Sequence, residues 1–274
     1  MARRRSWPRL TRDLPLTPLA GRGIVITRPD RQAAGLAALI DAAGGHALRY
    51  ATIEIEPLRT ARLDALLGRL ADYDVLVFIS RNAVEQGLAR IRESGMALSP
   101  VPGRPVVAAI GAGTRRALET EGFATVIAPE GPADSEALLA EPALANVSGK
   151  RIAVFRGEGG RETLAAGLRA RGATVDYAEC YRRRAPALDP QPLIAQWLRG
   201  EVHAVTVSSG EGLANLAARL GETARTLLVA LPVFVPHARV AEQARALGVA
   251  DVVVSGAADE DVMAALVAYF RRTG

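Results

Sequence analysis

Two stretches of the sequence, Gly23-Ile-Val-Ile-Thr-Arg28 and Arg151-Ile-Ala-Val-Phe-Arg156, decide the fold because they are two copies of one pattern. Each is a short apolar run that ends in an arginine, and each is followed by a helical pattern that stops at a glycine. The two closing glycines, Gly44 and Gly172, are 128 positions apart, as are the two arginines. A repeat this long is not a solenoid. It predicts two similar domains that face a shared cleft.

The rest of the chain alternates between strand-like and helix-like segments. Continuous apolar runs are typical of strands buried on both faces of a parallel sheet. Such runs occupy residues 75–80, 106–111, 204–208, 227–229 and 252–254. Apolar residues at helical spacing occupy residues 32–43, 83–93, 114–121, 161–171, 212–220 and 239–247. The alternation predicts an α/β fold with right-handed crossovers.

Two segments, residues 49–56 and 176–182, alternate polar with apolar side chains instead. Alternation predicts half-exposed strands. The two segments occupy equivalent places in the repeat, so they could pair with each other as the connection between the domains.

Charge and cysteine content exclude several classes of protein. Residues 1–21 hold five arginines, one aspartate and three prolines, so this segment carries most of the net charge of +5 and predicts a disordered basic tail. The body therefore lacks the charge of a nucleic-acid-binding fold. No apolar run is long enough to span a membrane, and no signal-peptide core follows the arginines. The single cysteine, Cys180, excludes an intrachain disulfide and favours a cytoplasmic protein.

Motifs for the common cofactors are absent from the sequence. The run Gly157-Glu-Gly-Gly160 lacks the third glycine of a dinucleotide-binding fingerprint, and no phosphate-binding loop occurs. These absences argue against a dinucleotide-dependent oxidoreductase. The three histidines, His46, His203 and His237, lack the spacing of metal ligands, and we expect His203 to be structural. Cys180 has no recognisable histidine and acid partner, so we expect a buried small residue.

Polar and small residues follow the predicted strands in both halves. Ligands of α/β proteins gather at this carboxyl edge, where helix N-termini attract anions. The candidate binding residues are Arg28, Ser80, Asn82, Gly111, Thr114, Arg156, Gly157, Arg161, Ser208, Ser209, His237 and Arg239. The hydroxyl and amide side chains could equally be helix caps, and the arginines could be salt-bridge partners. The equivalence of Arg28 and Arg156 in the repeat favours a function for them.

Seven pieces of the sequence match one known family in order and spacing. They are Ile26-Thr-Arg-Pro29, Ile53-Glu-Ile-Glu-Pro57, Phe78-Ile-Ser-Arg-Asn-Ala-Val84, Ala109-Ile-Gly-Ala-Gly-Thr114, Arg156-Gly-Glu-Gly-Gly-Arg161, Cys180-Tyr-Arg-Arg183 and Thr206-Val-Ser-Ser-Gly210. Through them the chain resembles the uroporphyrinogen-III synthases over residues 22–270.

The resemblance implies two flavodoxin-like domains with parallel sheets, joined by a two-stranded β-ladder, with a cleft between them. Domain one would combine residues 22–49 with 186–274, and domain two would cover residues 57–177. The linker strands would be residues 50–56 and 178–185.

The resemblance also implies an activity. These enzymes close hydroxymethylbilane, a linear tetrapyrrole with eight carboxylates, into uroporphyrinogen III with inversion of ring D and loss of water. The pyrroles supply the nucleophile, so the implied enzyme is a cyclising hydro-lyase without a cofactor or metal. Tyr181 matches the linker tyrosine proposed to assist departure of the hydroxyl, and the candidate binding residues would hold carboxylates.

The implied partners are the substrate and hydroxymethylbilane synthase, which would hand it to a monomeric enzyme. No nucleic-acid or membrane partner is expected. A non-catalytic two-lobed ligand-binding or sensor protein of the same fold is the alternative, since fold alone does not fix function.

Overall fold

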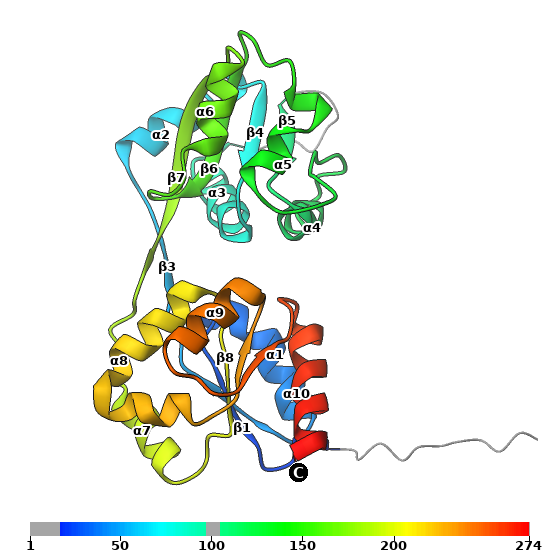
Figure 1. Ribbon diagram of the computed structural model, residues 1–274. Helices are drawn as coiled ribbons and strands as arrows, with labels where there is room; N and C mark the ends of the chain where they lie inside the picture. The colour runs from blue at the N-terminus through cyan, green and yellow to red at the C-terminus, as the bar shows by residue number, and fades with distance from the viewer. Residues whose placement is uncertain (1–16, 97–104, 274) are drawn as a thin grey trace, which may run out of the picture. The chain divides into compact units, whose positions relative to one another are not determined.

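The computed structural model describes residues 17–96 and 105–273, and the chain divides into two compact units. Unit 1 joins Met1–Glu54 to Ala185–Gly274, and unit 2 is Ile55–Arg184. In Figure 1 the blue and the yellow-to-red segments therefore build unit 1 together, whereas cyan and green segments build unit 2.

Unit 1 is organised around a five-stranded sheet with the order β10-β9-β8-β1-β2, in which every neighbouring pair is parallel. The strands are β1 (Gly23–Ile26), β2 (His46–Arg49), β8 (Ala204–Thr206), β9 (Val233–Val235) and β10 (Val252–Val254). All four residues of β1 are buried, because helices cover both faces of the sheet. Burial on both faces explains why the run has no polar alternation.

Helices cover both faces of the sheet of unit 1. They are α1 (Asp30–Ala42), α7 (Gln191–Leu198), α8 (Gly210–Val229), α9 (Ala238–Ala246) and α10 (Asp259–Thr273). Helices α1 and α10 share one apolar core with Ile24 and Ile26. Helices α7, α8 and α9 share the other core with Val25. Successive residues of β1 thus point to opposite faces, as the pleat requires.

Unit 2 has a second five-stranded sheet, with the order β3-β7-β6-β4-β5. Its strands are β3 (Glu54–Pro57), β4 (Val75–Phe78), β5 (Val106–Ala109), β6 (Arg151–Gly157) and β7 (Thr174–Arg184). The pairs β5–β4, β4–β6 and β6–β7 are parallel. Strand β6 lies between β4 and β7 just as β1 lies between β8 and β2, so the sequence repeat is a repeat of topology. The prediction of a mixed α/β fold with parallel sheets is confirmed.

Helices also cover both faces of the sheet in unit 2. The α-helices are α2 (Ala61–Leu67), α3 (Arg81–Glu93), α4 (Ala112–Thr120), α5 (Ser135–Leu139) and α6 (Thr163–Ala170), with 3-10 turns η1 (Leu70–Asp72) and η2 (Pro142–Leu144). Helices α2, α3 and α4 pack on the face that carries Phe78 and Phe155, whose stacked rings lie 4.6 Å apart. Helices α5 and α6 pack on the opposite face, against Val77 and Val154. Successive side chains of β4 and β6 therefore point to opposite faces of the sheet, and a residue can be assigned to one face by the neighbours it contacts.

One predicted strand is wrong. Residues 227–229 end helix α8, and the strand is Val233–Val235 instead. A short apolar run fits a buried helix segment as well as a strand, so periodicity alone could not separate them. Helix α8 also has a kink at Gly221, whose φ is 66°.

The predicted tail also needs correction at its end. Residues 1–16 lie outside the described part of the chain, but residues 17–21 form a turn instead of disordered chain. Leu19 is completely buried against α1 and α10, and its N–H donates to the Ala43 carbonyl at 3.0 Å. Burial of this leucine and the backbone hydrogen bonds of the turn together favour its ordered conformation.

Residues 50–53, predicted to begin a linker strand, are irregular chain in unit 1. Thr52 is completely buried, its N–H donates to the Thr27 carbonyl, and its own carbonyl accepts from the Asn215 amide at 3.0 Å. The backbone there is satisfied without a strand. Strand β3 begins only at Glu54, next to β7 in the sheet of unit 2. No helix in the described ranges is long and apolar enough to cross a membrane.

Candidate functional site

The carboxyl edge of the unit 2 sheet brings Ser80 and Tyr181 together. Ser80 follows β4 and caps helix α3, where its Oγ accepts the N–H of Ala83 at 3.0 Å. The same Oγ lies 2.9 Å from the Tyr181 hydroxyl. Tyr181 is only 3% exposed, so packing fixes its ring in one place. The serine that caps α3 and a tyrosine of β7 thus form one hydrogen-bonded pair.

A β-bulge between β6 and β7 sets the direction of the Tyr181 side chain. The pairing of β6 with β7 shifts between Arg156 and Gly157, so Tyr181 rather than Cys180 lies opposite Gly157. A Cβ on Gly157 would be 2.9 Å from Cε2 and Cζ of the Tyr181 ring, closer than carbon atoms approach. The N–H of Glu158 also donates to the Tyr181 carbonyl at 2.7 Å. The Tyr181 ring therefore packs directly against Gly157, where a larger residue would displace it. Bulges often redirect a side chain in this way.

Arg156 turns away from Tyr181, toward the other face of the sheet, and is 2% exposed. Its guanidinium donates to the carbonyls of Gly157 and Gly159, pairs with Glu162 at 3.3 Å and stacks on the ring of Tyr177 at 4.5 Å. These partners satisfy a buried charge that would otherwise be costly. In the structure Arg156 thus holds the loop at residues 157–160.

Glu162 and Tyr177, two partners of this arginine, are not among the residues predicted from the sequence. The Tyr177 hydroxyl donates to Glu162, and this hydrogen bond, together with the charges of Arg156 and Arg169, lowers the pKa of the Glu162 carboxyl. Burial and the neighbouring carboxylate raise the pKa of Tyr177. The Arg-Glu pair at 161–162 lies beside the glycine run, but nothing in the sequence indicated that the glutamate folds back onto Arg156.

Three other predicted residues of unit 2 surround the start of helices α3 and α4. Gly111 caps α4, and a Cβ there would lie 2.4 Å from the Cβ of Ala133, so only glycine lets this loop approach. Thr114 is buried in the first turn of α4 and Asn82 is half-buried in the first turn of α3. These residues leave small side chains at both helix starts.

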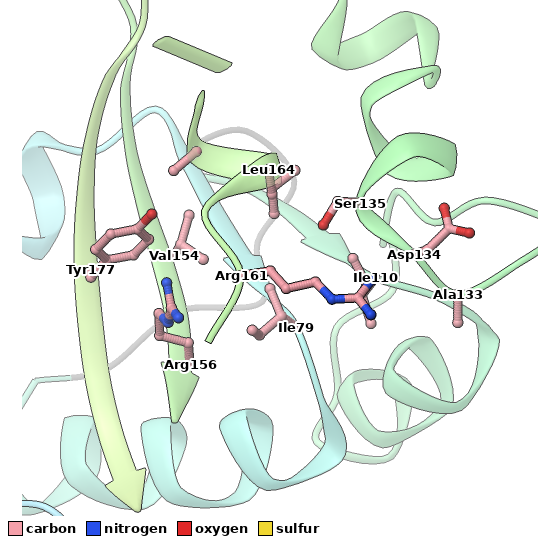
Figure 2. A pocket seen from close by; sticks show the side chains of 11 residues that line it. Ile79, Ile110, Ala133, Asp134, Ser135, Val154, Arg156, Arg161, Leu164 and Tyr177 are labelled. Carbon is pink, nitrogen blue, oxygen red and sulfur yellow. The ribbon is translucent and has the colours of Figure 1, made fainter. Parts of the chain in front are cut away.

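Arg161 lies on the other face of the same edge, at a pocket of about 210 Å³ (Figure 2). Arg161 is exposed, and its side chain extends toward Ile110. The pocket is separated from Tyr181 by the sheet, because Val154 and Arg156 line it whereas Phe155 packs on the opposite face.

Unit 1 places its predicted residues at its own carboxyl edge. The Arg28 guanidinium, 13% exposed, pairs with Asp259 and donates to the Ala257 carbonyl at 3.0 Å. Ser209 caps α8 by accepting the N–H of Gly212 at 3.1 Å. The remaining three residues, Ser208, His237 and Arg239, are exposed at the starts of α8 and α9.

Two other residues behave as the sequence predicted. His203 Nδ1 accepts the N–H of Gly23 at 3.0 Å, and burial, with a smaller contribution from Arg22, lowers the pKa of the imidazole. Cys180 is 1% exposed, and burial raises the pKa of its thiol to about 12. Within residues 17–96 and 105–273, no cluster of three or more His, Cys, Asp or Glu could hold a metal ion.

Known proteins resemble the chain along nearly its whole length. A family model described as uroporphyrinogen-III synthase HemD matches residues 34–265. The uroporphyrinogen-III synthase of Escherichia coli K12 is 33% identical over 242 residues, which cover 88% of this chain and 97% of that protein. The Salmonella typhimurium LT2 synthase is 35% identical with the same coverage.

Solved structures agree on the fold. A mutant uroporphyrinogen III synthase from the extremely thermophilic bacterium Thermus thermophilus superposes with a TM-score of 0.61 at 19% identity, covering 92% of this chain and all of that one. The Helicobacter pylori 26695 enzyme gives 0.58 at 12% identity, covering 90% of this chain and 99% of that one. The family model and the close relatives span the two units, and the chain belongs to the uroporphyrinogen-III synthase family.

Proposed function

We propose that the chain closes hydroxymethylbilane into uroporphyrinogen III, with inversion of ring D and release of one water. The observation that carries this proposal is the similarity to the Escherichia coli synthase, which extends over 97% of that protein. A match that covers 88% of this chain includes most of both units.

The chemistry of the substrate supports a hydro-lyase that needs no cofactor. Loss of the hydroxyl group leaves an electrophilic azafulvene, and an electron-rich pyrrole of the same molecule attacks it. The protein must therefore fold a flexible chain into the reactive geometry, assist the departing hydroxyl and keep water from the cation. Spontaneous closure gives the isomer without inversion, so specificity requires that the protein favour one transition state.

We propose that the Tyr181 phenol donates a hydrogen bond to the hydroxyl group that leaves the substrate. Ser80 Oγ already accepts the N–H of Ala83, so its own hydrogen is free to be donated to the Tyr181 oxygen 2.9 Å away. In that arrangement the phenol hydrogen remains available for the substrate. A hydrogen bond to developing hydroxide is charge-assisted and stronger than one between neutral groups.

We propose that the carboxylates of the substrate bind at helix N-termini and at exposed arginines. The N-termini of α3 and α4 in unit 2, and of α8 and α9 in unit 1, follow strands, and helix N-termini attract anions. The residues around them are Ser80, Asn82, Gly111, Thr114, Ser208, Ser209 and His237. Arg161 and Arg239 would bind carboxylates directly. Arg28 and Arg156 would act indirectly, because Asp259 and the loop at residues 157–160 already take their donors.

The finer organisation is part of the proposal. We regard the two units as flavodoxin-like domains that β3 and β7 connect as a two-stranded ladder. The lone cysteine is reduced and buried, which fits a cytoplasmic enzyme. We also propose that the enzyme acts as a monomer and receives its unstable substrate from hydroxymethylbilane synthase.

The experiment supplies the purified chain with hydroxymethylbilane generated in place by its synthase. Products are oxidised to porphyrins, and isomers I and III are separated by chromatography. Formation of isomer III above the enzyme-free control supports the proposal. Saturable binding of hydroxymethylbilane without faster conversion would instead indicate the non-catalytic binding protein.

A further inference from the structure

The pocket beside Arg161 lies in unit 2, on the face of the sheet away from Tyr181. Its floor is apolar and consists of Ile79, Ile110, Val154 and Leu164. Ile79 and Ile110 directly follow β4 and β5, so the pocket opens at the carboxyl edge of the sheet. It lies on the face covered by α5 and α6, opposite the face that holds Tyr181.

The charges that line the pocket include a cation with free donors. Arg161 forms no ion pair or hydrogen bond within the described parts of the chain. Arg156, in the wall, is satisfied by Glu162 and by loop carbonyls. The Asp134 carboxylate in the lining accepts the N–H of Ala137 at 2.8 Å as a helix cap. Arg161 is thus a guanidinium over an apolar floor, which is a combination that suits an acid with a small apolar body.

The wall of the pocket is rigid on the side of Arg156. The guanidinium of this residue is clamped between the Tyr177 ring and Glu162, and the Tyr177 hydroxyl is also bonded to Glu162. A preformed wall lowers the entropy that a ligand loses on binding. The feature is therefore built as a pocket and does not depend on one flexible side chain.

We propose that this pocket binds a single pyrrole ring that carries carboxylate arms, with Arg161 as the carboxylate ligand and the isoleucines against the ring. The proposal rests on the proposed function, because it assigns one ring of the tetrapyrrole to this pocket. The volume of about 210 Å³ accommodates one substituted ring and not four. With one ring held in the pocket, the linear tetrapyrrole is anchored at one end, and its other rings can reach the edge of the sheet that carries Ser80 and Tyr181.

The test uses a synthetic monopyrrole with one acetate and one propionate arm, titrated into the full chain and followed by ¹⁵N NMR. We expect saturable shifts at the amides of Ile79, Ile110 and Tyr177, with a Kd in the millimolar range or tighter, about what a fragment of this size achieves. Arg161→Gln should weaken binding about tenfold, the effect of losing a charge-assisted contact. Arg161 is exposed and has no partner among the described residues, so this variant should fold normally.

Arg116→Gln is the matched control, because it removes the same charge from an exposed position on α4, over the opposite face of the sheet. It should bind the probe as the unmodified chain does. Ser135→Leu tests the pocket without changing its charge, because the larger side chain would fill the pocket. This variant should abolish the probe-induced amide shifts.

Equal weakening by Arg116→Gln, or no shift at the lining amides up to about 10 mM, a concentration well above the expected Kd, would overturn the assignment. Binding of the probe is measured without turnover, so it can fail while isomer III still forms. Conversely, the pocket can bind the probe although the chain makes no isomer III, and the two proposals are then separated. In turnover, Arg161→Gln should raise KM for hydroxymethylbilane more than it lowers kcat.

Discussion

Replacing Tyr181 with phenylalanine removes one oxygen and leaves the packed ring in place. The lost atom lies 2.9 Å from Ser80 Oγ, which keeps its second partner, the N–H of Ala83. Since the serine hydroxyl stays bonded, the cost in stability is that of a single hydrogen bond, about 1 kcal/mol. For a chain of this size we expect the Tm to fall by only about 2–4 °C.

The effect on catalysis should be much larger. A hydrogen bond to a developing hydroxide contributes about 1.5–3 kcal/mol, which corresponds to a decrease in kcat of about ten- to a hundredfold. Ser80→Ala should lower kcat by less, because the phenol hydrogen is then no longer fixed in direction but is still present. It should also lower stability by about 1 kcal/mol, since α3 loses its cap.

The double variant distinguishes a working pair from two independent residues. If Ser80 acts only through Tyr181, then Ser80→Ala should have almost no further effect on kcat in the Tyr181→Phe background. The assay is the initial rate of isomer III formation at saturating hydroxymethylbilane, with circular dichroism and Tm as controls for folding. A kcat for Tyr181→Phe within about twofold of the unmodified chain, a free-energy change of under about 0.5 kcal/mol, would refute the assignment.

Three further predictions follow from individual contacts. Gly157→Ala should displace the Tyr181 ring, because the new Cβ would be 2.9 Å from it, and the free energy of unfolding should fall by about 1–3 kcal/mol. Formation of isomer III should also slow, and unaltered activity would show that the position of the ring is not critical. The pKa of His203 is lowered by burial, so the folded chain binds fewer protons there than the unfolded chain, and stability is lost as pH falls through the ordinary pKa near 6.5. The Tm should therefore drop more between pH 7.5 and pH 5.5 in the unmodified chain than in His203→Asn, which keeps an acceptor for Gly23; identical pH profiles would contradict this. The thiol of Cys180, with its pKa raised to about 12, should resist iodoacetamide at pH 8 until denaturant is added, as mass spectrometry can show, and rapid labelling of the folded chain would contradict its burial.

The sequence was most informative where structure follows local pattern. The apolar runs that start at Gly23 and Arg151 predicted equivalent central strands, and β1 and β6 occupy equivalent places in two parallel sheets. Strands buried on both faces have a pattern that hardly depends on distant partners. The pairing of Ser80 with Tyr181 could not be predicted in this way, although both residues were named as candidates. It depends on the β-bulge after Arg156, and a bulge is visible only when the partner strand is known.

Features that depend on tertiary contacts were missed for the same reason. The segment at residues 50–53 was predicted to begin a half-exposed strand, but Thr27 and Asn215 satisfy the backbone of Thr52 inside unit 1. Arg28 and Arg156 were candidates because they follow predicted strands, and their equivalence in the repeat favoured a function for them. Only the structure shows that Asp259 takes one guanidinium, and that Glu162 and loop carbonyls take the other.

We propose above that this chain directs ring closure toward the inverted isomer. The most direct measurement is the ratio of isomer III to isomer I after complete conversion of hydroxymethylbilane by the purified full chain, set against the same reaction with heat-denatured chain. We predict that isomer III dominates with the native chain and that isomer I dominates with the denatured chain. Equal ratios in the two reactions would contradict the account.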